Sequence, residues 1–146
     1  MHESLCLKLS RVPRLWRAII DYRLAPLGLT QTRWVTLYHL WNMGDGQPQC
    51  DLARTIGVEA PSLVRTLDQL AHQGLIERRP SDEDRRTKLV YLTAKATPLL
   101  ERIETVVQEA REEMLHGISD ADLDHFETVL CLIEKNGQTL LSRQET

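Results

Sequence analysis

The chain has 146 residues, of which 42% are hydrophobic and only 5% aromatic, a composition typical of one small, mainly helical domain with an extension. No apolar run is long enough to cross a membrane, and the N-terminal residues carry no secretory signal. Three scattered cysteines, Cys6, Cys50 and Cys131, have the spacing of neither a disulfide framework nor a metal site. We therefore expect a cytoplasmic protein without a metal or a cofactor.

The charge is unevenly distributed along the chain. Its net value is -3, yet residues 1–95 hold 14 basic and 10 acidic side chains, whereas residues 96–146 hold 4 basic and 11 acidic ones. The acidic C-terminal part thus masks a mildly basic front part. Such a front part is compatible with binding to DNA but does not establish it.

Apolar spacing predicts six helices and one short hairpin. The first helix covers residues 5–24, and Pro13 inside it should kink the helix or mark a new start. The second runs from Thr30 to the break at residues 44–46, the third covers residues 49–56 and the fourth residues 60–73. Two β-prone segments, 75–79 and 88–93, enclose a polar loop. A fifth helix, distorted at its start by Pro98, ends at Gly117, and a sixth begins at Ser119 with heptad-like apolar spacing.

The order helix, tight turn, helix and hairpin defines the expected fold class. It is mainly α with a small β-hairpin, a winged helix-turn-helix flanked by N- and C-terminal helices. The apolar stripes of the first and sixth helices need a partner surface, which favours dimerisation through these two helices. We expect residues 1–29 to form the N-terminal dimerisation helix and residues 30–97 the DNA-binding lobe. Residues 98–146 should form a connecting helix and the C-terminal dimerisation helix.

The fourth helix has a polar face suited to DNA. With Leu63, Val64, Leu67 and Leu70 facing the core, the opposite face presents Ser62, Arg65, Thr66 and Gln69. Arginine binds guanine through two hydrogen bonds, glutamine binds adenine, and serine or threonine reaches phosphates or bases. Pro61 lies in the first turn, where unpaired amides attract phosphate. The alternative is an ordinary solvated helix face.

The loop of the hairpin carries two arginines, Arg85 and Arg86, beside three acids. An arginine side chain fits the narrow, electronegative minor groove of A·T-rich DNA. We expect Asp84 to orient one of these arginines by an ion pair rather than to touch DNA. The alternative is a solvated charge run with local ion pairs.

Linked motifs carry a resemblance to a known family. They are the segments 61–70 and 74–76, the wing motif Asp84-Arg85-Arg86 and the pair Leu92-Thr93. Together they resemble the multiple-antibiotic-resistance regulator (MarR) family. The SlyA branch of this family is similar at residues 16–18, 29–32 and 34–37. The resemblance implies an obligate homodimer that regulates transcription on the nucleoid. It further implies that Pro61, Ser62, Arg65, Thr66 and Gln69 lie in the major groove and that Arg85 or Arg86, with Arg86 preferred, enters the minor groove. Two-fold symmetry predicts an inverted-repeat operator.

The family also implies release from DNA by small aromatic acids. Arginines that bind a carboxylate and aromatic walls that hold a ring would form such a site, from Arg14, Arg17, Trp34, Tyr38 and His39. The alternative places Trp34 and Tyr38 in the core and leaves the arginines in solvent or on DNA. Cys6 is a candidate redox switch, although neither exposure nor a lowered pKa is visible from the sequence.

Two other classes of protein compete with a regulator. An enzyme needs a nucleophile with its base, or paired carboxylates, and the sequence contains no recognisable set. An adaptor would keep the fold and lose DNA binding, but the retained Arg65 and Arg86 argue against it.

Overall fold

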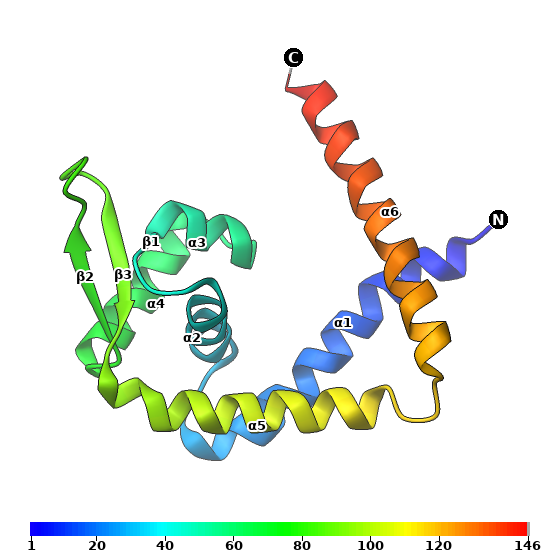
Figure 1. Cartoon of the computed structure of the whole chain (residues 1–146), viewed down its shortest axis with the longest axis horizontal. Coiled ribbons are helices and arrows are strands. Elements are labelled where there is room, and N and C mark those ends of the chain that lie inside the picture. The colour runs from blue at the N-terminus through cyan, green and yellow to red at the C-terminus, as the bar shows by residue number, and fades with distance from the viewer. Residues whose placement is uncertain (146) are drawn as a thin grey trace. The chain divides into compact units, whose positions relative to one another are not determined.

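The computed structural model describes residues 1–145 as helices and a small sheet (Figure 1). Its elements in chain order are α1 (Glu3–Leu24), η1 (Ala25–Leu27), α2 (Gln31–Met43), β1 (Gln47–Pro48), α3 (Gln49–Ile56), α4 (Ala60–His72), β2 (Ile76–Pro80), β3 (Lys88–Leu92), η2 (Ala94–Ala96), α5 (Thr97–Met114) and α6 (Asp120–Gln144). The predicted fold class, mainly α with a small β element, is confirmed. No helix among residues 1–145 is long and apolar enough to span a membrane.

The chain divides into two compact units, Met1–Arg111 and Glu112–Thr146. The first contains α1 together with the helix-turn-helix and the sheet. The second contains the last turn of α5 and α6. The division by role expected from the sequence, at residues 29/30 and 97/98, stays a prediction.

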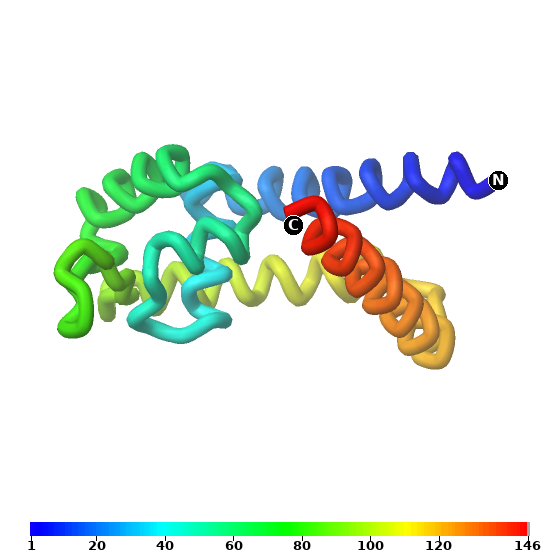
Figure 2. The backbone as a smooth tube through the Cα atoms, turned by 90° about the horizontal axis from the view of Figure 1, so that it is seen from above, coloured from blue at the N-terminus to red at the C-terminus, as the bar shows by residue number. Residues whose placement is uncertain are grey.

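Helix α1 continues through Pro13 without interruption (Figure 2). A new helix start at this position, one of the two expected outcomes, is therefore wrong. The proline ring fits the helical φ but cannot donate the hydrogen bond to the carbonyl of Leu9. Burial of Ile20 and Leu24 in the core anchors the C-terminal half of the helix.

The sheet has three antiparallel strands in the order β1-β3-β2, one more than the predicted hairpin. In the hairpin Ile76 pairs with Leu92 and Pro80 with Lys88. The third strand, β1, is only two residues long and ends in a proline, so no alternating pattern predicts it. It pairs with β3 because Gly46, at φ 81°, turns the chain and donates to the carbonyl of Val90.

The core of the first unit lies between the C-terminal part of α1 and α2, α3, α4, β3 and α5. Its fully buried side chains are Leu24, Leu37, Leu40, Leu52, Leu63, Leu67, Leu70, Val90 and Ile103. Each such side chain stabilises the fold by about 1.5–3 kcal/mol relative to its exposed state. This core packs α3, α4 and the hairpin stem against one another.

Helix α6 begins at the predicted cap. The Ser119 hydroxyl accepts the backbone N–H of Asp122 at 3.1 Å, which satisfies one of the helix's unpaired donors. The helix has no buried residue. Its exposed apolar side chains are Phe126, Val129, Leu130, Leu132, Ile133, Leu140 and Leu141.

Candidate nucleic-acid interface

The turn between α3 and α4 is set by a glycine. Gly57 has φ 84°, in the left-handed region, and its N–H donates to the carbonyl of Ala53 at 2.9 Å, as a glycine that ends a helix does. Helix α4 starts three residues later with Pro61 in its first turn. The N-terminus of α4 and the polar side chains that follow it are therefore held at a defined angle to α3.

The exposed face of α4 contains Pro61, Ser62, Arg65 and Gln69, as predicted. Thr66 departs from the prediction, because it is only 7% exposed and its hydroxyl donates to the carbonyl of Ser62. Val64 departs in the opposite direction and is 38% exposed. The predicted exposed position of Thr66 and the predicted core position of Val64 were therefore both wrong.

Helix geometry explains the exchange of Thr66 and Val64. At about 100° per residue, Thr66 lies about 70° from the mean direction of Leu63, Leu67 and Leu70, whereas Val64 lies about 90° from it. A side chain at about 70° from this mean direction is thus still buried, whereas one at about 90° is exposed. Polarity alone assigned each residue to the wrong face of the helix.

The wing tip between β2 and β3 is shaped by Asp84 in a way that the sequence did not predict. Its carboxylate accepts the backbone N–H of Arg86 at 3.0 Å and the hydroxyl of Thr87 at 3.5 Å. Its carbonyl accepts the N–H of Thr87 at 2.9 Å. Within residues 1–145 no ion pair joins Asp84 to Arg85 or Arg86, so the expected ion pair is wrong. Asp84 orders the backbone of the tip and leaves both arginines exposed.

The stem of the wing is tied to α4 and to its own neighbours. Arg78 of β2 forms an ion pair with Asp68 of α4 at 2.7 Å. Arg79 lies 4.4 Å from the centre of the Tyr91 ring and donates to Glu77 at 2.9 Å. The hydrogen bond to Glu77 raises the pKa of Arg79. The Arg78–Asp68 pair joins the hairpin to α4, and the contacts of Arg79 lie within the hairpin.

The base of the hairpin is held by two further hydrogen bonds. The Thr93 hydroxyl donates to the carbonyl of Gly74 at 2.6 Å, and the carboxylate of Asp45 accepts the N–H of Leu92 at 2.8 Å. The contact of Asp45 spans 47 positions of the sequence, and no local motif marks it. The stem residues Ile76 and Val90 are buried and anchor the hairpin to the core.

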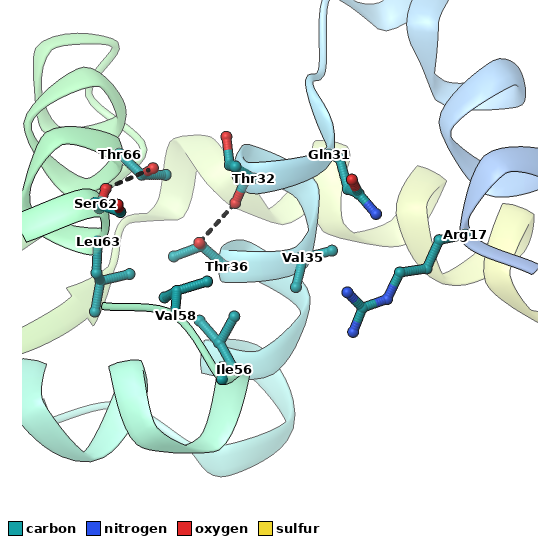
Figure 3. Close-up of a pocket in the computed structure, with 11 residues that line it drawn as sticks. Arg17, Gln31, Thr32, Val35, Thr36, Ile56, Val58, Ser62, Leu63 and Thr66 are labelled. Atoms are coloured by element: carbon teal, nitrogen blue, oxygen red, sulfur yellow. Dashed lines mark hydrogen bonds between the residues drawn. The ribbon is translucent and has the colours of Figure 1, made fainter. Parts of the chain in front are cut away.

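A cavity of about 150 Å³ lies beside the helix-turn-helix (Figure 3). Its polar groups come from α1 and α2, through Arg17, Gln31 and Thr32, and from α4, through Ser62 and Thr66. Val35, Ile56 and Val58 supply apolar walls. A molecule in this cavity would contact the same helix that carries the exposed polar face.

The structure does not bring together the five predicted ligand residues. Arg17 alone among them lines this cavity. Trp34 is 4% exposed and donates its indole N–H to Asp21, so it belongs to the core. Tyr38 packs against the core and edge-on to His39, with 6.3 Å between the ring centres. For Trp34 and Tyr38 the core alternative is the one that the structure supports.

The other two predicted ligand residues are engaged locally. Nδ1 of His39 lies 2.8 Å from the carbonyl of Val35, one helical turn away. Arg14 donates to the hydroxyl of Ser10 at 2.8 Å and to its carbonyl at 3.2 Å. Both contacts stay within one helix. Gln31 and Thr32, which do line the cavity, were not predicted as ligand residues, because the prediction considered arginines for a carboxylate and aromatic side chains for a ring.

All three cysteines, Cys6 included, are free and exposed. Exposure is one of the two properties that a redox switch needs. Within residues 1–145 no group of histidines, cysteines and acids is arranged to hold a metal ion.

Comparisons with known proteins identify the family. Residues 29–88, which include α2, α3, α4 and most of the wing, match the model of the MarR family. The crystal structure of transcriptional regulator PA3341 is 40% identical, with a TM-score of 0.87 over 92% of this chain and 98% of that chain. CouR from Rhodococcus jostii RHA1, solved bound to p-coumaroyl-CoA, is 26% identical, with a TM-score of 0.78 over 90% and 92% of the two chains.

A mutant MarR from E.coli, solved in complex with operator DNA, is 23% identical, with a TM-score of 0.79 over 90% of this chain and 94% of that chain. At this identity the likeness concerns the fold alone. The family model coincides with the helix-turn-helix and wing described above, and the 40% identity with PA3341 extends over nearly the whole chain. This chain therefore belongs to the MarR family of transcriptional regulators.

Proposed function

We propose that this protein is a sequence-specific DNA-binding regulator of transcription that acts as a homodimer on A·T-rich inverted-repeat operators. One observation carries the proposal. One lobe with a shared core exposes Ser62, Arg65 and Gln69 along one helix, next to a wing whose two arginines are also exposed. The motifs at residues 16–18, 29–32 and 34–37 favour the SlyA-like branch of the family.

Helix α4 is proposed to lie in the major groove. The Arg65 guanidinium matches the two acceptors of guanine, N7 and O6. Ser62, in the first turn, lies beside the unpaired amides of the helix N-terminus, which attract a phosphate. Thr66 is buried and bonded to Ser62, so its contribution is to hold the first turn rather than to contact a base.

The wing is proposed to enter the minor groove. Arg86 follows the ordered turn at Asp84, and its own guanidinium is free of ion pairs among the described residues. A narrow A·T-rich minor groove has an enhanced negative potential that attracts such a group. Arg85 is the alternative if Arg86 contributes nothing.

Dimerisation is proposed to cover the apolar side chains that the single chain leaves in solvent. In α6 they recur along the helix, and in α1 Leu5, Leu7, Val12 and Leu15 are 44–65% exposed. Apolar surface of this extent normally marks an interface. A two-fold dimer places its two α4 helices about 34 Å apart, in successive major grooves.

A small aromatic acid is proposed as the effector. Arg17 offers a carboxylate partner at the cavity beside α4, and apolar residues form its walls. The p-coumaroyl-CoA complex of the relative CouR supports an aromatic acyl ligand. A ligand there would touch Ser62 and Thr66, so that binding and release of DNA are coupled through α4.

Electrophoretic mobility shift on A·T-rich genomic fragments, followed by footprinting, tests the function. We expect a two-fold symmetric footprint that competitor DNA does not abolish and that Arg65→Ala combined with Arg86→Ala removes. Binding no tighter than to random DNA would favour the adaptor alternative. Protection of a single asymmetric half-site would contradict the homodimer.

A further inference from the structure

Gln69, one of the exposed side chains of α4, is held by a residue from another helix. The Nε–H of Arg33, in the first turn of α2, donates to Oε1 of Gln69 at 3.3 Å, across 36 positions of the sequence. Arg33 is half-buried, and within residues 1–145 its guanidinium forms no ion pair with a carboxylate. Its remaining N–H groups stay available beside Gln69.

The contact determines which end of the Gln69 amide faces outward. A guanidinium has five N–H donors and no acceptor, so it can hold the oxygen of the amide but not the NH₂ group. The reversed amide would place donors against donors. The NH₂ group of Gln69 therefore points away from Arg33.

We propose that Arg33 is a positioning residue that changes the base preference of Gln69 from adenine to guanine. A free glutamine offers an acceptor and a donor, which match N6–H and N7 of adenine. Arg33 occupies one of the two lone pairs of the Gln69 oxygen. The pair adds donors beside it, from the amide NH₂ and the remaining guanidinium N–H groups. Guanine presents two acceptors, N7 and O6, at its major-groove edge, whereas adenine presents one acceptor and one donor.

This inference rests on the proposed function, because it requires α4 to lie in the major groove. Selection of bound duplexes from a randomised DNA pool, with the full-length protein, tests both. The variants are Arg33→Met, Gln69→Ala and Arg33→Lys, with Arg54→Met as the control. Arg54 is a 79% exposed α3 side chain that pairs with Asp51, so its substitution removes the same charge without touching Gln69. Circular dichroism melts verify that each variant is folded.

We expect the unmodified protein to favour guanine at one position of each half-site besides the position that Arg65 contacts, and Gln69→Ala to abolish the preference at that further position only. Arg33→Met should lower the guanine-to-adenine affinity ratio there by about fivefold or more, the discrimination of one paired contact, and leave other positions unchanged. Arg33→Lys keeps a donor and should give an intermediate ratio. Arg54→Met should keep the full profile.

Three results overturn the proposal. A preference of the unmodified protein for adenine at the position that responds to Gln69→Ala contradicts it directly. A second result is that Arg33→Met loses affinity uniformly and keeps the base-preference profile, while Gln69→Ala alters that profile. In that case Arg33 is a phosphate contact, and the proposed function stays intact. Absence of any enriched sequence removes the proposed function and this inference together.

Discussion

Replacement of Asp84 tests whether the wing tip is pre-ordered for DNA. The carboxylate accepts one backbone N–H and one hydroxyl within the loop, and exposed hydrogen bonds of this kind contribute about 0.5–1.5 kcal/mol. The contacts are confined to the tip, so Asp84→Ala should leave the melting temperature nearly unchanged. The tip must then be ordered when DNA binds, at a cost of about 0.5–1 kcal/mol per wing.

Asp84→Asn separates this effect from charge. Both variants remove one negative charge that repels phosphate, but the amide oxygen of asparagine can still accept the N–H of Arg86. Two wings give a total of about 1–2 kcal/mol, so Asp84→Ala should bind the operator about fivefold to 30-fold more weakly than Asp84→Asn. Fluorescence polarisation at one fixed salt concentration measures the ratio, and hydrogen exchange of the Arg86 and Thr87 amides should be faster in Asp84→Ala. Equal affinities of the two variants would refute the reasoning.

The other predictions concern the wing, the recognition helix, the core and the dimer. Arg86→Ala should keep thermal stability, weaken DNA binding most on operators with A·T-rich flanks, and make the salt dependence of binding shallower. Arg86→Lys should restore only part of the affinity. An unchanged affinity and salt slope in Arg86→Ala would shift the role to Arg85. Arg65→Ala should remove discrimination at one position per half-site, about 1–3 kcal/mol each in competition binding, and a loss that is uniform across sequences would mark a phosphate contact instead. Leu67→Ala should lower the free energy of unfolding in urea by about 2–5 kcal/mol, since Leu67 is fully buried; a loss below 1 kcal/mol would contradict its place in the core. Phe126→Asp should shift the protein toward monomer in sedimentation, and an unchanged dimer would exclude this part of α6 from the interface.

The sequence was sufficient for the order of the six helices and the hairpin, though not for β1, because local signals determine that order. Gly57 ends one helix and Pro61 begins the next, Ser119 caps α6, and the apolar spacing of Leu63, Leu67 and Leu70 defines a helix with one buried face. Such turn, cap and periodicity signals act over a few residues. The linked motifs at residues 61–70, 84–86 and 92–93 carried the resemblance to the family that the comparisons confirm.

Only the tertiary structure decided what each polar side chain does, because its partners lie far along the chain or belong to the backbone. Thr66 is buried and Val64 exposed because the packing of α4 sets where its buried face ends. Trp34 of α2 donates a hydrogen bond to Asp21 of α1, and Arg33 of α2 donates one to Gln69 of α4. The sequence shows which residues have hydrogen-bonding groups, but the direction of each group depends on distances between helices that no local pattern encodes.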